Sequence, residues 1–125
     1  MDFRKRTIKV RDTDIEFDCD ASGLPIADLS EDMSRVASQM AYWSSVLASA
    51  EGEKMETDAY YRHWRATKSQ AILLSDPKAA EWKIKNGCEA DEQFLKLKRA
   101  LAIAEENVII SKGIFEAFSK KANML

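Results

Sequence analysis

The apolar residues follow a heptad-like spacing over two long stretches of the chain, about residues 28–74 and 91–125. Apolar positions that alternate between three and four residues apart form a seam along one side of an α-helix, and such a seam packs lengthwise on a second helix. The first seam consists of Leu29, Met33, Val36, Met40, Trp43, Leu47, Ala50, Lys54, Thr57, Tyr61 and Trp64. The second consists of Phe94, Leu97, Leu101, Ala104, Val108, Ser111, Phe115, Phe118, Ala122 and Leu125. Because the connection between the stretches is short, the pattern predicts a long antiparallel, coiled-coil-like helical hairpin.

Local signals predict where the long helices begin and end. Asp28 and Glu31 form a variant of the capping box at the start of the first helix. We expect this helix to continue to about Leu74 and to be weakened near Gly52. Asp91 is expected to open the last helix.

The connection between the long helices has its own start and stop signals. Asp76-Pro77 offers an N-cap and a proline at the first helical position. Asn86-Gly87 is a good C-terminal stop. The sequence therefore predicts a short helix over about residues 78–85.

The N-terminal part of the chain has a different, two-residue period. Apolar and polar side chains alternate over residues 7–10 and 15–17, around a turn-rich junction at residues 11–14, which predicts a β-hairpin. Two strands alone are marginally stable in water, so this hairpin must pack on something or pair with another copy. The expected fold is mainly α, with residues 1–27 forming the β-hairpin and a linker and residues 28–125 the helical hairpin domain.

A second apolar row lies beside the seam of the last helix. It consists of Leu95, Ile103, Ile110 and Ile114. One partner helix covers one seam, so this wider apolar face must be buried against something further. Other copies of the chain are the favoured occupants, which predicts a homo-oligomer. The alternative is that the N-terminal hairpin folds back over the row within one chain.

The charges are segregated along the chain although the total is only −2. Residues 1–11 carry a net charge of +4, residues 12–32 of −8 and residues 60–88 of +4. Electrostatic fields in salt solution act over a Debye length of about 8–10 Å. A basic segment can therefore bind an anion on a chain that is acidic overall.

Most enzyme and metal chemistry has no counterpart in the sequence. The two cysteines, Cys19 and Cys88, are too far apart for a metal motif and are expected to be reduced thiols. His63 is the only histidine, and its place on a charged helix face favours a solvated side chain over a general base. Phosphate-binding and dinucleotide-binding glycine motifs are missing as well. We expect no catalytic residues, no metal and no cofactor.

The chain also lacks the sequence features of a membrane or secreted protein. Its start runs into charged residues without an apolar segment behind them. No stretch approaches the ~20 apolar residues of a membrane span. We therefore expect a cytoplasmic protein with no membrane partner.

Basic and aromatic side chains interleave over residues 60–68 and 82–85. Single-stranded nucleic acid needs cations for its phosphates and flat rings for its unstacked bases. Tyr61 and Trp64 are seam positions, so they are expected in the core, whereas their preceding neighbours turn outward. Trp82 either stacks on a base or forms the core of the short helix. The candidate nucleic-acid-binding residues are Tyr60, Arg62, His63, Arg65, Lys68, Trp82, Lys83 and Lys85.

Several short motifs in residues 35–125 resemble those of small bacteriophage recombination mediators of the UvsY-like family. They are Tyr61-Arg62-His63-Trp64-Arg65, Asp76-Pro77-Lys78 followed by Glu81-Trp82-Lys83, Glu105 with Asn107-Val108, and Lys112-Gly113 followed by Phe115-Glu116-Ala117-Phe118. The resemblance implies an α-helical, ring-forming oligomer that binds single-stranded DNA. It also implies that the protein helps to load a RecA-type recombinase onto DNA coated by single-strand-binding protein, in the host cell cytoplasm if the chain is phage-encoded. The β-hairpin and the acidic net charge depart from the family pattern.

Two other functions are compatible with the same sequence. The first is a coiled-coil adaptor or structural protein that binds only protein. The second is an inhibitor of a host nucleic-acid enzyme that presents the acidic strand with Asp14, Glu16 and Asp18 as a DNA mimic. The faces that are exposed in the structure discriminate between these hypotheses.

Overall fold

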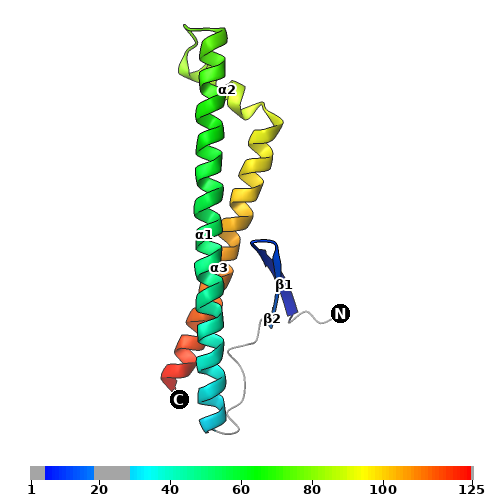
Figure 1. The fold of residues 1–125 in the computed structure, drawn as a ribbon. Coiled ribbons are helices and arrows are strands. Elements are labelled where there is room, and N and C mark those ends of the chain that lie inside the picture. Colours follow the sequence, from blue (N-terminus) through cyan, green and yellow to red (C-terminus); the bar gives the residue numbers. More distant parts are fainter. Residues whose placement is uncertain (1–4, 19–28, 125) are drawn as a thin grey trace.

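The computed structural model describes residues 5–18 and 29–124, which form a β-hairpin and three α-helices (Figure 1). The elements are β1 (Lys5–Val10), β2 (Thr13–Asp18), α1 (Leu29–Ser75), α2 (Glu81–Glu89) and α3 (Glu92–Met124). α1 and α3 lie side by side in opposite directions, and α2 joins them at one end (Figure 1). The predicted fold, a long helical hairpin with a short helix between its arms and an N-terminal β-hairpin, is confirmed.

The two predicted seams form the interface between α1 and α3. Most of the described seam side chains are buried or half-buried; the exceptions are Met33 and Lys54, which are exposed. Three seam positions with almost no exposed surface have small side chains, namely Ala50, Ala104 and Ser111. The predicted capping box of Asp28 and Glu31, the side chain of Leu29, and Leu125 lie outside the described residues, as does Cys19.

α1 continues through Gly52 without interruption. A Cβ atom at Gly52 would lie 2.6 Å from Nη2 of Arg11, so the glycine leaves room for a side chain of the β-hairpin. The backbone N–H of Arg11 donates to Glu53 Oε2 at 2.7 Å, and its guanidinium donates to both carboxylate oxygens of Glu56 at 3.0 and 3.3 Å. The glycine that was expected to weaken the helix is therefore a docking position.

α2 begins three residues later than predicted, at Glu81. Asp76 and Pro77 form a turn instead of the first helical turn, in which the Asp76 carbonyl oxygen accepts from Ala79 N–H at 3.0 Å. The Asp76 side chain also accepts from Lys78 N–H, at 3.3 Å. Asp76 thus caps a turn, and the prediction of an N-cap with a helical Pro77 was wrong.

α2 also runs past the predicted stop at Asn86-Gly87, to Glu89. Gly87 has no positive φ, so it does not end the helix in the left-handed conformation. Instead it lets α2 approach α1, since a Cβ there would lie 2.8 Å from Cδ1 of Ile72. The next residue, Cys88, is fully buried, with its Sγ 3.7 Å from Ser69 Oγ. Packing against α1 therefore determines the end of this helix.

Asp91 caps α3 as predicted. Its carboxylate accepts from Gln93 N–H at 2.8 Å, and its carbonyl oxygen accepts from Phe94 N–H at 3.1 Å. A carboxylate at this position satisfies a backbone donor and interacts favourably with the positive end of the helix dipole.

The β-hairpin has a tighter turn and longer strands than predicted. Only Arg11 and Asp12 lie in the turn, with φ of 48° and 64°. Positive φ at both central residues gives a turn whose twist matches that of the flanking strands. Val10 therefore pairs with Thr13, and Ile8 with Ile15.

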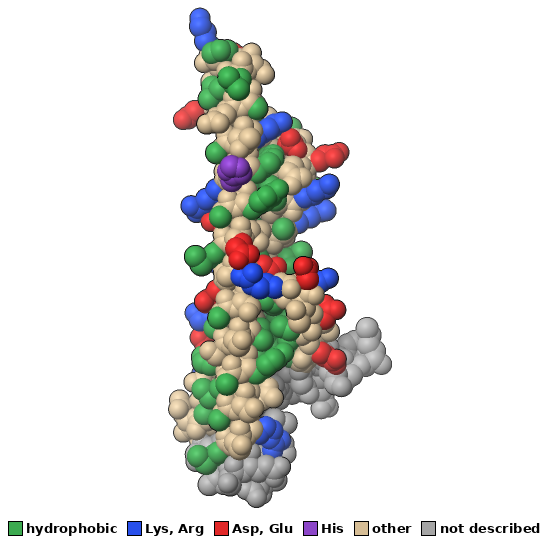
Figure 2. Space-filling model, in the orientation of Figure 1, with side chains coloured by type: hydrophobic (Ala, Val, Ile, Leu, Met, Phe, Trp, Pro, Cys, Tyr) green, Lys and Arg blue, Asp and Glu red, His purple; other side chains and the backbone are tan. Residues whose placement is uncertain are grey.

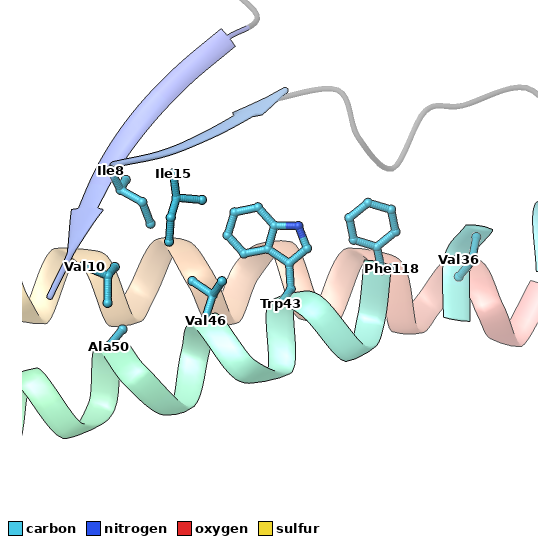
Figure 3. Close-up of a cluster of buried hydrophobic side chains, with 8 residues drawn as sticks. All are labelled: Ile8, Val10, Ile15, Val36, Trp43, Val46, Ala50 and Phe118. Carbon is cyan, nitrogen blue, oxygen red and sulfur yellow. The ribbon is translucent and has the colours of Figure 1, made fainter. Parts of the chain in front are cut away.

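The hairpin folds back on the two long helices and shares one core with them (Figure 3). Its inner face contributes Ile8, Val10 and Ile15 to a cluster with Trp43 and Phe118. Burying each apolar side chain of this size stabilises the fold by about 1.5–3 kcal/mol. The long helices thus supply the packing partner that a two-stranded hairpin needs in water. The Lys9 carbonyl oxygen also accepts from Asn107 Nδ2 at 2.7 Å, which ties β1 to α3.

The segregated charges of the N-terminal region meet across the hairpin. The strand register places Lys9 opposite Asp14, and both side chains are exposed. Opposite charges on facing positions stabilise a pair of strands. The basic first strand thus lies beside the acidic second strand.

Candidate nucleic-acid interface

The candidate site lies where α2 folds back on α1. Contacts of Gly87 and Cys88 with α1 hold α2 against the last turns of that helix. Between the two helices is an open groove of about 510 Å³, which we call the basic-aromatic groove. Its lining residues are Arg65 of α1 and Glu81, Trp82, Ile84 and Lys85 of α2.

Trp82 is 67% exposed and lies in the first turn of α2. A tryptophan that formed the core of a short helix would be largely buried, so the alternative interpretation of Trp82 does not fit its position. An exposed indole beside charged groups offers a flat apolar surface for another ring. Ile84, which is half-buried, adds apolar surface to the same groove.

Arg65 is oriented by Tyr61. Its Nη1 donates to the Tyr61 hydroxyl at 3.1 Å, and this hydrogen bond raises the pKa of the guanidinium. The other N–H groups of Arg65 stay available to a ligand, because the residue has no ion pair in the described part of the chain. Tyr61 itself is buried, as its seam position predicted.

A second cation, which the sequence did not predict, lies beside Tyr61. Lys98 of α3 places its Nζ 4.5 Å from the centre of the Tyr61 ring, close enough for a cation–π contact. Nothing in the local sequence of α3 indicates this contact, because Lys98 follows the seam residue Leu97 like any outward-facing lysine. The antiparallel pairing of the helices brings it to Tyr61.

Lys85 and Glu81 lie one helical turn apart in α2 and both line the groove. Each side chain is exposed, and neither forms an ion pair with any residue that the structure describes. The groove thus contains two cations and one carboxylate, and none of the three has an ion-pair partner among the described residues.

Two other predicted cations are paired with carboxylates and do not line the groove. Arg62 Nε lies 3.0 Å from Asp58 Oδ2. Lys83 Nζ lies 2.6 Å from Asp76 Oδ2, and this hydrogen bond holds the pKa of Asp76 below its usual value. Both pairs are largely exposed, so solvent screens them and each contributes little to stability.

Lys68 has a structural contact instead of a free charge. Its Nζ lies 3.0 Å from Asp91 Oδ2, which links α1 to the residue that caps α3. The Gln93 N–H and then the Lys68 ammonium hold the pKa of Asp91 below its usual value. Lys68 is half-buried and does not line the groove.

The outward-facing members of the predicted set, Tyr60 and His63, are exposed, and the seam residue Trp64 is half-buried. The face of α1 is therefore oriented as the heptad pattern predicted. Figure 2 shows basic and acidic side chains interspersed along one face of the molecule, without one continuous basic patch. A binding site on this surface must be local, as the groove is.

The predicted oligomer row is partly buried within the chain. Ile110 and Ile114 are half-buried and pack against the core that the long helices share with the folded-back hairpin. Leu95 and Ile103 are 51% and 54% exposed. Half of the row is thus covered within the chain, and the other half is open.

The acidic face of β2 is exposed at Asp14 and Glu16, while the side chain of Asp18 lies outside the described residues. Within the described ranges, no three His, Cys, Asp or Glu side chains are placed to hold a metal ion. In the same ranges, no helix combines the length and the apolar character needed to cross a bilayer.

Comparisons of the chain with models of protein families, with curated proteins and with solved structures found no match.

Proposed function

We propose that this protein binds single-stranded DNA in the basic-aromatic groove and acts as a non-enzymatic accessory in DNA recombination. The observation that carries the proposal is the exposed ring of Trp82 in a groove with Arg65 and Lys85, two cations that no described carboxylate pairs with. An unpaired cation is ready to bind a phosphate without first giving up another partner.

The arrangement suits single strands better than duplex DNA. A base that stacks on an exposed indole contributes about 1–3 kcal/mol, and only an unpaired base can do so. Arg65 and Lys85 come from different helices on the two sides of the groove, so they can contact phosphates on either side of a base that is stacked on Trp82. Such binding is tolerant of sequence because every base has a flat face.

The paired cations add a weaker, exchangeable contribution. Arg62 and Lys83 lie in exposed ion pairs, whose small net energy lets a phosphate replace the carboxylate. We do not assign such a role to Lys68, because its pair with Asp91 connects two helices.

The role in recombination is supported by the sequence resemblance to UvsY-like mediators. A mediator holds single-stranded DNA and passes it to a RecA-type recombinase in the presence of single-strand-binding protein. The exposed Leu95 and Ile103 support self-association, which would place several grooves along one strand. Linked grooves raise the affinity for a long strand without any new contact. The DNA-mimic alternative is less favoured, because Lys9 lies opposite Asp14 and interrupts the acidic surface.

The test is a salt-dependent titration of labelled single-stranded and duplex DNA. Removing a phosphate contact should lower the magnitude of the log–log salt slope by up to ~0.7 in Arg65→Ala and in Lys85→Ala. Trp82→Ala should lower the affinity by ~1–3 kcal/mol with little change of slope, since a ring displaces no counterions. The melting temperature of Trp82→Ala should stay nearly unchanged because the ring is mostly exposed.

Lys112→Ala is the matched control for the cations, because Lys112 is exposed on α3 and does not line the groove. It should leave both the affinity and the salt slope as in the unaltered protein. Equal affinity of the unaltered protein and of a variant lacking the Arg65, Trp82 and Lys85 side chains would refute the proposal and favour a protein-only adaptor.

A further inference from the structure

The basic-aromatic groove contains one residue that phosphate binding does not explain. Glu81 lines the groove and directly precedes Trp82 in α2. A carboxylate beside a phosphate site is unfavourable by simple charge repulsion. A carboxylate in the first helical turn interacts favourably with the helix dipole, but this interaction does not require the side chain to face the groove.

Glu81 also forms no ion pair with the lysine that follows it by one turn. A glutamate four residues before a lysine is the favourable order for a pair on a helix. Nevertheless Glu81 and Lys85 are not in contact, and neither has an ion-pair partner in the described ranges. The carboxylate is therefore available to a ligand that also contacts Trp82.

We infer that Glu81 makes the groove select bases that carry an amino group, namely cytosine, adenine and guanine, over thymine and uracil. This inference rests on the proposed binding of single-stranded DNA. An ionised carboxylate can only accept hydrogen bonds. The amino groups of cytosine, adenine and guanine donate, whereas thymine and uracil offer only their N3–H, which lies between two oxygens that repel a carboxylate. A base stacked on Trp82 thus presents to Glu81 either an amino group or a single N–H flanked by two acceptors.

The cations of the groove cannot make this contact with an amino group. Arg65 and Lys85 carry donors only, so they bind the acceptor atoms that both kinds of base carry and cannot accept from an amino group. Trp82 and Ile84 contact a base through apolar surface and do not distinguish an amino group from a carbonyl. A preference for cytosine that is lost in Glu81→Gln therefore reports on Glu81.

The experiment compares oligonucleotides of deoxycytidine and deoxyuridine of equal length, which differ only in the amino or carbonyl group and the neighbouring ring nitrogen. The full-length protein should bind the deoxycytidine strand about threefold to tenfold more tightly, as expected for hydrogen bonding to a base edge. Glu81→Gln offers both a donor and an acceptor, so it should bring the ratio of the two affinities close to one. The ratio is the measured quantity, because losing a negative charge strengthens binding of both strands.

Glu92→Gln is the control, since Glu92 is exposed in the first turn of α3 and does not line the groove. It removes the same charge and should keep the preference for deoxycytidine. Tight but equal binding of both strands by the unaltered protein, or a preference for deoxyuridine, would overturn the inference and leave the proposed function intact. A preference that persists in Glu81→Gln would also overturn it. If neither strand binds, the proposed function and the inference fail together.

Discussion

Replacing Ser111 with alanine should make the protein more stable. Ser111 occupies a seam position of α3 and has no exposed surface. Its hydroxyl oxygen is buried without a hydrogen-bond partner among the described residues. Ser111→Ala removes this single atom and leaves the rest of the seam unchanged.

The expected gain follows from three contributions. A buried hydroxyl without a partner costs about 1–3 kcal/mol relative to its hydrated state. Alanine also favours the helix over serine by up to ~0.5 kcal/mol. Against this stands the packing lost with one oxygen atom, a small fraction of the effect of deleting a larger buried group. We therefore expect the free energy of unfolding to rise by about 1–2 kcal/mol.

Urea unfolding at a fixed protein concentration measures this change, and thermal unfolding should show an increase of roughly 3–6 °C per kcal/mol for a domain of this size. Ser45→Ala is the control, because Ser45 is exposed in α1 and the change reports helix propensity alone. A loss of stability in Ser111→Ala would show that the hydroxyl has a hydrogen-bond partner in solution, and the reasoning would be refuted.

Two further predictions concern the charged contacts. Arg11→Ala should lower the free energy of unfolding by less than ~1 kcal/mol, because the pair with Glu56 is exposed. It should nevertheless accelerate amide hydrogen exchange in β1, and unchanged exchange would contradict a docking role for Arg11. Stability should be constant near neutral pH and fall as the pH drops below about 4, because the pKa values of Asp76 and Asp91 are lowered in the folded state from their usual 3.8. Asp91→Asn should weaken this acid dependence in urea unfolding series, and an unaltered dependence would exclude Asp91 as a contributor.

The helices could be predicted because their pairing depends on spacing within short stretches of sequence. Alternating intervals of three and four residues indicate an interface wherever the helix lies. The ends of α2 could not be predicted in this way. Gly87 has the local appearance of a stop, and only its approach to Ile72 of α1 shows that it is a packing position.

The composition of the candidate site was predictable, but its geometry was not. Arg62, Arg65, Lys68 and Lys83 look equivalent in the sequence, whereas the structure pairs three of them with carboxylates and leaves only Arg65 in the groove. The Lys68 contact spans two helices, so no local rule could identify it. The exposure of Trp82 likewise follows from how α2 lies on α1.

The contact between Lys68 and Asp91 has a consequence for how the site could be altered. It marks the level at which α3 begins, and α1 continues from there to Ser75, seven residues or about 10 Å further. This overhang is one heptad long, and α2 folds back along it. Shortening α1 by that heptad would preserve the heptad register of α1 up to Lys68. It would remove only the segment of α1 against which α2 packs. The length of this overhang thus determines whether α2 has a surface to pack on, and therefore whether Arg65 in the preceding turn of α1 lines a groove.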